Sequence, residues 1–422
     1  MEIYLDNAAT TRVDDVVVAK VSEVMSKDFG NASSLHDVGK RAGKRLEDAR
    51  EKIAGYFGCD AKEIVFTSGG TESNNLAIRG LTKANPEKKH IVTSVIEHPC
   101  VLDTCRALEK DGYEVDYVGV GSDGVVDVSE IEKLIRDDTL LVSVMYVNNE
   151  VGTIQPVEDI GLVCRKRGVY FHSDNVQGFL KEDLALASID LMSVSGHKVC
   201  APKGVGVLYV RDGVKILPIL TGGGQENGLR SGTENVPGAV GLAAAIDVDF
   251  KIEEVRASRD LIIEGLKKIL GAKINGSLTN RVYNNVSISF YGIEGEALMM
   301  MLDGDGVYVS TGSACASTKL KGSYVLEAMG VDGMYLNGSL RLSLGKDVIG
   351  REAEIVEKIT KHVLKLREIS PFKVPKELMV DSSSRGLADA EGCALHEGCS
   401  EAAGLSDVKD DDENEKEVDE NE

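Results

Sequence analysis

The chain has 422 residues, a formal net charge of −21 and a hydrophobic content of 42%. At roughly 150 residues per folding unit, this length predicts two or three units and is enough to bury a large core. No apolar run approaches the roughly 18 residues of a membrane span, and the first residues lack the basic start and apolar stretch of a signal peptide. These properties exclude a membrane-spanning protein and predict a cytoplasmic one.

The negative charge is concentrated at the end of the chain. Residues 376–422 hold 16 acidic and 4 basic side chains. This segment is rich in Ser, Gly, Ala, Asp and Glu, and it cannot bury enough apolar surface to offset the entropy of ordering, so we predict a disordered acidic tail. The remaining sequence has no broad basic patch, and stable binding to nucleic acid is not expected. The eight scattered cysteines indicate free thiols in a reducing compartment.

Segments of strand length alternate with helical patterns between about residues 41 and 210. This order predicts an α/β fold with a mostly parallel sheet covered by helices on both faces. A long amphipathic stretch over 238–270 leads to a second region, which looks like a smaller α+β domain with strands at 286–290 and 340–344 around a helix at 294–302. The strands predicted in the first region are 64–67, 91–95, 115–118, 140–147, 169–173 and 191–194.

A glycine turn follows the first of these strands. Residues 67–75 read as strand end, turn and helix start, where backbone N–H groups and the Thr71 hydroxyl could hold a phosphate. An ordinary turn with a threonine cap is an equal alternative, and a Walker loop is excluded because no Gly-Lys-Ser/Thr follows. Residues 119–124 match a dinucleotide fingerprint, but they lie deep inside the sheet order, and their Asp and Ser favour a plain turn.

Two polar groups follow apolar strands further along the chain. Asp174 closes the run from Val169, and Lys198 follows the strand at 191–194 in the sequence Ser-Gly-His-Lys. Pyridoxal phosphate needs a lysine amine for its Schiff base and a carboxylate at its pyridinium nitrogen. Open α/β sheets bind ligands just past the carboxyl ends of their strands. Each residue alone is more often a surface lysine or a cap, but the pair in register predicts a pyridoxal phosphate site.

Other side chains suit the same site. His98 follows the strand at 91–95, where an imidazole could stack on a cofactor ring or move protons, although a structural role is the more common one. The amides of Asn149 and Gln177 could donate to the phenolic oxygen of the ring. Arg341 is a charge in an apolar stretch and needs an anion, either a substrate carboxylate or an internal Asp or Glu.

Cys315 lies among small residues, which is typical of an exposed loop rather than a core position. A thiolate there could attack a bound substrate, although a lone cysteine is more often inert. The tail carries Cys393, His396 and Cys399, but three ligands in an acidic segment fall short of a closed zinc site. We therefore predict no metal site.

In this order the motifs closely resemble the NifS/IscS-type cysteine desulfurases, in the class V aminotransferase family with pyridoxal phosphate fold type I. The resemblance implies a homodimer that takes sulfur from L-cysteine and leaves L-alanine. It also implies a large cofactor-binding domain at 14–250, a small domain at 1–13 plus 251–374, and the tail at 375–422. It covers about residues 2–372 and rests on residues 4–11, 67–75, 97–98, 147–150, 195–198, 222–226, 230–235 and 312–315.

The resemblance also implies roles for single residues. Lys198 would hold the cofactor as a Schiff base, Asp174 would contact its pyridinium nitrogen, and His98 would stack on the ring and act as acid and base. Cys315 would take the sulfur as a persulfide. The cofactor phosphate would be bound by Gly70, Thr71, Ser195, His197 and, from the other subunit, Thr233; the phenolic oxygen by Asn149 and Gln177; and the substrate carboxylate by Arg341 and Asn149.

The loop around Cys315 resembles the loop of those cysteine desulfurases that pass sulfur to scaffold proteins for iron–sulfur cluster assembly or tRNA thiolation. Two departures put the packing around the cofactor in doubt, because Asn175 stands where Ala usually lies beside the ring and Cys200-Ala201 replaces Tyr-Gly. Three rival functions stay open: an aminotransferase or selenocysteine lyase of the same fold, a non-catalytic assembly scaffold and, more distantly, a nicotinamide dehydrogenase resting on 119–124.

Overall fold

The computed structural model describes residues 2–183, 186–312 and 322–375. The chain divides into two compact units, Met1–Val374 and Pro375–Glu422. All but the first residue of the second unit lies outside the described ranges, and so do the predicted tail and its Cys393, His396 and Cys399. The fold described below is that of the first unit.

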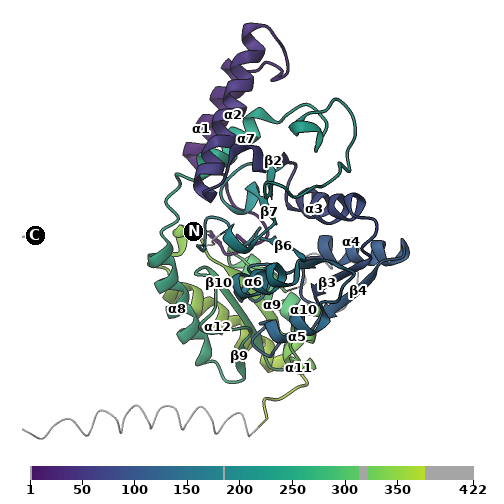
Figure 1. The fold of residues 1–422 in the computed structure, drawn as a ribbon. Coiled ribbons are helices and arrows are strands. Elements are labelled where there is room, and N and C mark those ends of the chain that lie inside the picture. Colours follow the sequence, from purple (N-terminus) through teal and green to yellow (C-terminus); the bar gives the residue numbers. More distant parts are fainter. Residues whose placement is uncertain (1, 184–185, 313–321, 376–422) are drawn as a thin grey trace, which may run out of the picture. The chain divides into compact units, whose positions relative to one another are not determined.

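A mainly parallel sheet forms the centre of the described part of this unit (Figure 1). Its seven strands follow the order β2-β8-β7-β6-β5-β3-β4. The strands from β7 to β4 in this order run parallel, whereas β8 is antiparallel to both of its neighbours. The strands are β2 (Ile64–Thr67), β3 (His90–Ser94), β4 (Glu114–Val118), β5 (Thr139–Ser143), β6 (Tyr170–Asp174), β7 (Leu191–Ser195) and β8 (Gly206–Val210).

Successive residues of these strands enter different hydrophobic clusters. Val65, Leu141 and Leu191 pack on one face with α3 (Gly70–Ala84) and α4 (Pro99–Lys110). Their chain neighbours Phe66, Val142 and Met192 pack on the other face with α5 (Val128–Leu134) and α6 (Val157–Arg167). Because strand side chains alternate between faces, a sheet covered on both sides needs apolar residues at consecutive positions. The predicted mostly parallel sheet is thereby confirmed.

Two details of the sheet differ from the prediction. Strand β8 was not predicted as a separate element, and it runs antiparallel beside the edge strand β2. The strand predicted over 140–147 ends at Ser143, although Val144 and Tyr146 still donate their N–H groups to the carbonyls of β6.

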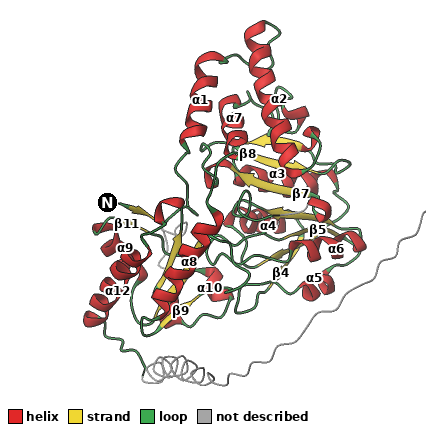
Figure 2. Ribbon diagram, turned by 90° about the vertical axis from the view of Figure 1, so that its left-hand side faces the viewer, coloured by secondary structure: helices red, strands yellow, loops and turns green. Residues whose placement is uncertain are grey.

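Helices surround the sheet, and α1, α2 and α7 form a packed group at the top of Figure 1, which Figure 2 shows from the side. The predicted amphipathic stretch at 238–270 corresponds to two helices, α7 and α8. The helices of the described residues are α1 (Asp15–Lys27), α2 (Asp37–Phe57), α3 (Gly70–Ala84), α4 (Pro99–Lys110), α5 (Val128–Leu134), α6 (Val157–Arg167), α7 (Val236–Ala245), α8 (Ile252–Lys267), α9 (Gly295–Gly304), α10 (Tyr324–Ala328), α11 (Gly333–Leu336) and α12 (Glu352–Ile369).

Two smaller sheets complete the fold of the described residues. The antiparallel sheet has the order β12-β10-β9, and β1 pairs with β11 in parallel. Helices α8 and α12 contact each other beside them. The predicted α+β character of this second region is confirmed. The domain boundaries predicted within residues 1–374 stay predictions, since these residues form one compact unit. The strands are β1 (Ile3–Tyr4), β9 (Ala272–Ile274), β10 (Asn285–Phe290), β11 (Val307–Tyr308) and β12 (Ser339–Ser343).

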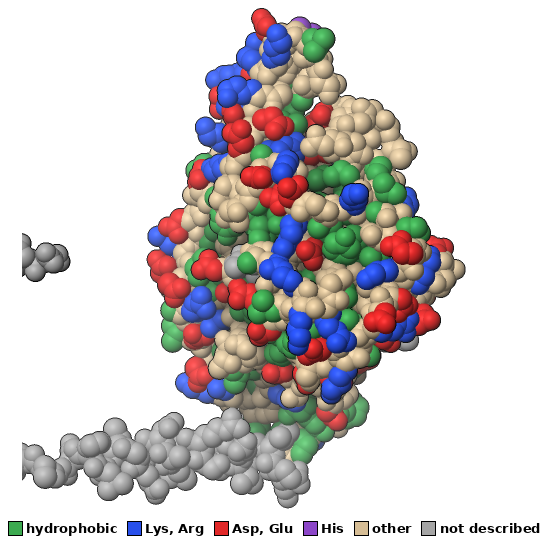
Figure 3. Space-filling model, viewed as in Figure 1, with side chains coloured by type: hydrophobic (Ala, Val, Ile, Leu, Met, Phe, Trp, Pro, Cys, Tyr) green, Lys and Arg blue, Asp and Glu red, His purple; other side chains and the backbone are tan. Residues whose placement is uncertain are grey.

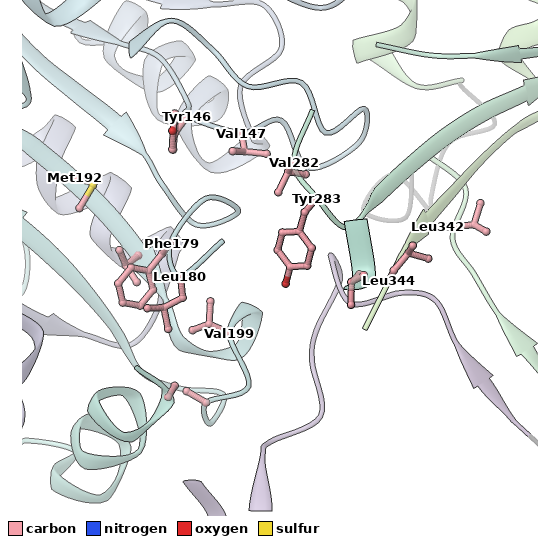
Figure 4. Packing of buried hydrophobic residues seen from close by; sticks show 14 of the residues in the cluster. Tyr146, Val147, Phe179, Leu180, Met192, Val199, Val282, Tyr283, Leu342 and Leu344 are labelled. Carbon is pink, nitrogen blue, oxygen red and sulfur yellow. The ribbon is translucent and has the colours of Figure 1, made fainter. Parts of the chain in front are cut away.

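One continuous core joins the two regions. Figure 4 shows Tyr283, Val282 and Leu344 from the second region near residues of the central sheet and its loops. Tyr146, Phe179 and Val199 belong to the same buried cluster. Buried aromatic side chains contribute large apolar contact areas, so this packing ties the second region to the edge of the sheet where the candidate site lies.

The described part of the chain contains no helix long and apolar enough to cross a membrane. On the face seen in Figure 3, acidic and basic side chains are interspersed.

Candidate active site

A cavity of about 1050 Å³ opens past the carboxyl ends of β3, β5, β6 and β7. This is the edge at which open α/β sheets bind ligands. Thr233 is exposed and does not line the cavity, and Cys315 lies outside the described residues. The cavity brings together the remaining predicted site residues: Gly70, Thr71, His98, Asn149, Asp174, Gln177, Ser195, His197, Lys198 and Arg341.

The N-terminus of α3 forms one end of the cavity. No side chain caps this N-terminus, and the N-cap residue Gly69 has a φ of 150°. A Cβ on Gly70 would lie 2.6 Å from Cγ2 of Val176, so only glycine allows the helix to approach this loop so closely. The backbone N–H groups and dipole of an uncapped helix N-terminus attract an anion. This end therefore suits the phosphate expected there.

The carboxylate of Asp174 lies at the end of β6. Its Oδ2 accepts a hydrogen bond from Nδ2 of Asn74 at 2.7 Å, and its Oδ1 accepts one from the backbone N–H of Val176 at 3.0 Å. Asp174 is buried, and these two donors hold its carboxylate in one orientation. Sequence reasoning missed Asn74; its only signal was its place inside the motif at 67–75.

The ring of His98 caps the N-terminus of α4, which begins at Pro99. Nδ1 of His98 accepts from the backbone N–H of Cys100 at 3.2 Å. A backbone amide can only donate, so the neutral ring carries its proton on Nε2. Burial lowers the pKa of His98; the charge of Asp174 opposes this shift, and the charge of Lys198 adds to it. The net shift favours the neutral ring.

A second cysteine lies beside this ring. Sγ of Cys100 is 3.0 Å from Nδ1 of His98 and accepts from Nδ2 of Asn74 at 3.1 Å. Burial, with the nearby charge of Asp174, raises the pKa of the Cys100 thiol to about 12. Since the thiolate is the nucleophilic form, Cys100 is unreactive at neutral pH despite lining the cavity.

The N-terminal segment holds the predicted lysine. Nζ of Lys198 donates to the carbonyl oxygens of Ala8 at 2.6 Å and Ala9 at 2.7 Å. Nδ1 of His197 lies 3.2 Å from Oγ1 of Thr10. Burial lowers the pKa of His197 to about 4, with smaller contributions from neighbouring lysines that include Lys198. Residues 8–10 near the start of the chain thus position the Ser-Gly-His-Lys sequence at residues 195–198.

Arg341 projects from β12 and has an internal partner. Its Nη2 donates to Oδ1 of Asp6 at 2.9 Å, and its Nη1 donates to the carbonyl of Asn149 at 3.1 Å. The internal acid considered from the sequence is therefore present, but it occupies only part of the guanidinium. Within the described residues, Nε of Arg341 and Oδ1 of Asn149 are buried without a hydrogen-bond partner.

Buried polar atoms in native proteins are nearly always paired, so these two atoms mark a place for a ligand. The cavity also offers an anion site at α3, a fixed carboxylate at Asp174 and an amine at Lys198. Pyridoxal phosphate requires that set of groups. The residues present fit this cofactor.

The structure corrects the expectation about Asn175. Nδ2 of Asn175 donates to Sδ of Met192 at 3.3 Å, and the side chain does not line the cavity. The chain turns directly after Asp174 because Val176 donates its N–H to that carboxylate, and the turn brings Val176 into the cavity wall. The prediction that Asn175 lies beside the ring is wrong. Cys200 does not line the cavity either, and its N–H donates to Oγ1 of Thr11 at 2.8 Å.

Two buried acids flank the cavity without having been predicted. Burial raises the pKa of Glu97 to about 8 although Ser94 and the N–H of Met145 donate to it. Burial likewise raises the pKa of Glu150 to about 7. Oγ of Ser323 donates to Glu150. Glu97 and Glu150 stand beside His98 and Asn149 in the chain, which was their only signal in the sequence.

Comparison with known proteins agrees with this geometry. Residues 3–355 match the model of the aminotransferase class-V family. The chain therefore belongs to this family, whose enzymes use pyridoxal phosphate.

Within the family, the chain is similar to proteins named cysteine desulfurases. It is 47% identical to "Cysteine desulfurase IscS" of Methanosarcina thermophila, over 89% of this chain and 95% of the relative. It is 44% identical to "Probable cysteine desulfurase, mitochondrial" of Dictyostelium discoideum, over 88% of this chain and 85% of the relative.

Two solved structures share the fold. A structure titled "NIFS-LIKE PROTEIN" has a TM-score of 0.82 and 41% identity, over 87% of this chain and all of the other. A structure titled "SspA in complex with cysteine" has a TM-score of 0.74 and 37% identity, over 82% of this chain and 99% of the other. The predicted fold class is thereby confirmed.

Proposed function

We propose that this protein is a pyridoxal-phosphate-dependent cysteine desulfurase. The observation that carries the proposal is a single cavity in which Lys198 and Asp174 meet the partly unpaired Arg341. The names of its relatives point to the same activity. The reaction converts L-cysteine and the Cys315 thiol into L-alanine and a Cys315 persulfide. One carbon–sulfur bond breaks and one sulfur–sulfur bond forms, so no outside oxidant or reductant is needed.

The cofactor, when bound, supplies an electron sink that weakens bonds near the substrate amino group. Lys198 is the attachment point, because it contributes the amine in the cavity. Gly70, Thr71, Ser195 and His197 surround the end that suits its phosphate. Asp174 would pair with the pyridinium nitrogen, since its two hydrogen bonds keep the carboxylate in place.

Arg341 and Asn149 bind the substrate carboxylate. The guanidinium keeps Nε free of partners within the described residues, while Asp6 and the carbonyl of Asn149 orient its two terminal nitrogens. A guanidinium recognises a carboxylate through paired N–H donors.

Two side chains move protons. The neutral ring of His98 presents Nε2–H to the cavity, since Nδ1 is held by the N–H of Cys100. The amine of Lys198 rests on the carbonyls of Ala8 and Ala9, which provide a place for it when it is not bonded to cofactor. Proton transfer is most efficient when the pKa of the transferring group lies near the working pH. Burial lowers the pKa of His98 and so favours its neutral form.

Cys315 is the nucleophile that accepts sulfur. It lies in the segment 313–321, outside the described residues. The residues on either side of that segment, Gly312 and Gly322, both line the cavity, which supports an origin of the nucleophile beside the substrate. Cys100 is the other candidate, but the raised pKa of its thiol argues against it.

A visible absorption spectrum with and without L-cysteine tests the proposal. The purified protein should be yellow, its spectrum should change on adding L-cysteine, and alanine should form in the amount of sulfur released. Transfer of an amino group to a keto acid would favour an aminotransferase, and preference for selenocysteine a selenocysteine lyase. A colourless protein would favour a non-catalytic scaffold.

The assembly and the pathway belong to the same proposal. The enzyme acts as a homodimer in which Thr233 reaches the cofactor phosphate of the partner subunit. Thr233 is exposed and does not line the cavity of its own chain, which agrees with this role. The persulfide passes to a scaffold protein for iron–sulfur assembly or tRNA thiolation in the cytoplasm. Light scattering tests the dimer, and a Thr233→Ala variant with weaker cofactor binding would support the shared site.

A further inference from the structure

A buried lysine next to the cavity has no role in the mechanism above. Lys181 follows β6 in a turn, and 5% of its surface is exposed. It does not line the cavity. Its Nζ donates to Oε1 of Gln177 at 3.0 Å.

The other end of the Gln177 amide points to the N-terminal segment. Nε2 of Gln177 donates to the carbonyl of Ala8 at 2.9 Å. The same carbonyl accepts from Lys198 at 2.6 Å, and Gln177 lines the cavity. A chain of hydrogen bonds thus runs from Lys181 through Gln177 and Ala8 to the amine of Lys198.

This chain determines which way the amide faces. The carbonyl of Ala8 can only accept, so the NH₂ of Gln177 must face Ala8. Lys181 in its protonated form can only donate, so it holds the amide oxygen on its own side. A reversed amide would set NH₂ against the ammonium and oxygen against oxygen. Without Lys181, the orientation of the Gln177 amide would be held by the carbonyl of Ala8 alone.

The burial of an amine here is costly. Burial lowers the pKa of Lys181 to about 7; the charge of Lys198 acts in the same direction, and Cys200 and Glu182 oppose it. A buried cation is rarely the most stable choice at a site that an apolar side chain could fill. The unfavourable burial of the Lys181 amine beside the cavity is better explained by a functional constraint than by packing.

We propose that Lys181 is a positioning residue that holds the NH₂ group of Gln177 toward the phenolic oxygen of bound pyridoxal phosphate. The inference rests on the proposed function, since it assumes that cofactor in the cavity. A fixed N–H donor favours the ionised phenolic oxygen, whereas a carbonyl oxygen turned toward it favours the protonated one. Loss of Lys181 therefore raises the pH at which the bound chromophore loses its proton.

The test is a pH titration of the visible absorption of the holoenzyme. Lys181→Met should raise the midpoint by about one pH unit, which corresponds to a tenfold change in the protonation equilibrium. Lys181→Arg keeps a donor to Gln177, so its midpoint should stay close to that of the wild type. Lys62→Met is the matched control, because Lys62 pairs with Asp212 on the surface, and it should titrate as wild type.

A double-variant cycle separates orientation from charge. In a Gln177→Ala background, adding Lys181→Met should shift the midpoint little further, because the group that Lys181 orients is absent. A full shift in that background, or an unchanged midpoint in Lys181→Met alone, would overturn the inference. If Lys181→Met does not fold, Lys181→Gln replaces it: this variant keeps an N–H donor without the charge, and its midpoint should match that of the wild type.

Different results contradict the proposed function and the role of Lys181. A wild-type protein without a visible chromophore, or without a response to L-cysteine, contradicts the proposed function. A yellow and responsive wild type with an unshifted Lys181→Met variant contradicts only the role of Lys181.

Discussion

The cofactor end and the substrate end of the cavity are built differently. At the cofactor end, Asp174 and Lys198 follow neighbouring strands, and each makes at least two hydrogen bonds. At the substrate end, Asn149 and Arg341 come from different regions of the fold, and both keep a buried polar atom without a partner within the described residues. The hydrogen bonds that hold Asp174 and Lys198 are formed before any ligand binds, whereas Arg341 keeps a donor for the ligand.

The difference has an energetic reason. A buried unpaired polar atom costs roughly 1–3 kcal/mol, which a substrate can recover by bonding to it. The unpaired Nε of Arg341 therefore favours a ligand with a carboxylate, whereas the unpaired Oδ1 of Asn149 requires a ligand group that donates a hydrogen bond. Variants at the cofactor end should change the colour of the protein, and variants at the substrate end should leave it yellow but slow its response to cysteine.

The largest effect is expected at the cofactor end from Lys198→Ala. Only a lysine amine can form and release the Schiff base, so turnover should be abolished while the fold persists. The absorption spectrum and circular dichroism of the purified variant measure both properties. Turnover like that of the wild type would remove Lys198 from the mechanism.

Cys315→Ser should come next, and it separates sulfur transfer from both ends. The variant should bind cofactor and change its spectrum with L-cysteine, yet release almost no sulfide, because a hydroxyl is a far weaker nucleophile than a thiolate. Mass spectrometry of the wild type with L-cysteine and no reductant should find one extra sulfur on the Cys315 peptide. Cys59→Ser is the control, because burial also raises the pKa of that thiol to about 12.

The extra sulfur could instead appear on another cysteine. Sulfur on Cys100 would contradict the raised pKa of that thiol, and sulfur on Cys200, Cys393 or Cys399 would mean that the nucleophile has been misassigned.

Asp174→Asn should have a smaller effect that is still confined to the cofactor end. The amide can keep the geometry but cannot hold the pyridinium proton, so cofactor should bind while the rate falls by more than about tenfold, or 1.4 kcal/mol. Steady-state kinetics at saturating cysteine measure the loss. A smaller change would show that another acid faces the ring.

Arg341→Lys should have the smallest effect and should act on the substrate end alone. Lysine keeps the charge but loses the fork of N–H donors, so KM for cysteine should rise by about tenfold while the spectrum without substrate stays unchanged. Titration of the spectral change with L-cysteine gives the affinity directly. An altered spectrum in the absence of cysteine would show that Arg341 serves the cofactor instead.

Much of the central sheet could be predicted from the sequence. Residues 140–142 in β5 are apolar at consecutive positions, a pattern typical of a strand that lies inside a parallel sheet and is buried on both faces. Strand β8 was missed as a separate element, because nothing local specifies that this segment runs antiparallel to its two neighbours.

The sequence by itself determined the reactive groups. A lysine, an acid and a glycine turn placed directly after strands must meet at one edge of the sheet, because parallel strands end together there. Only the tertiary structure decided how these groups are held. Asp6 contacts Arg341, and Ala8 and Ala9 contact Lys198, across large separations in the chain. Lys181 contacts Gln177 within one turn, and Gln177 lines the cavity. Such contacts depend on packing in three dimensions, and no periodicity along the chain records them.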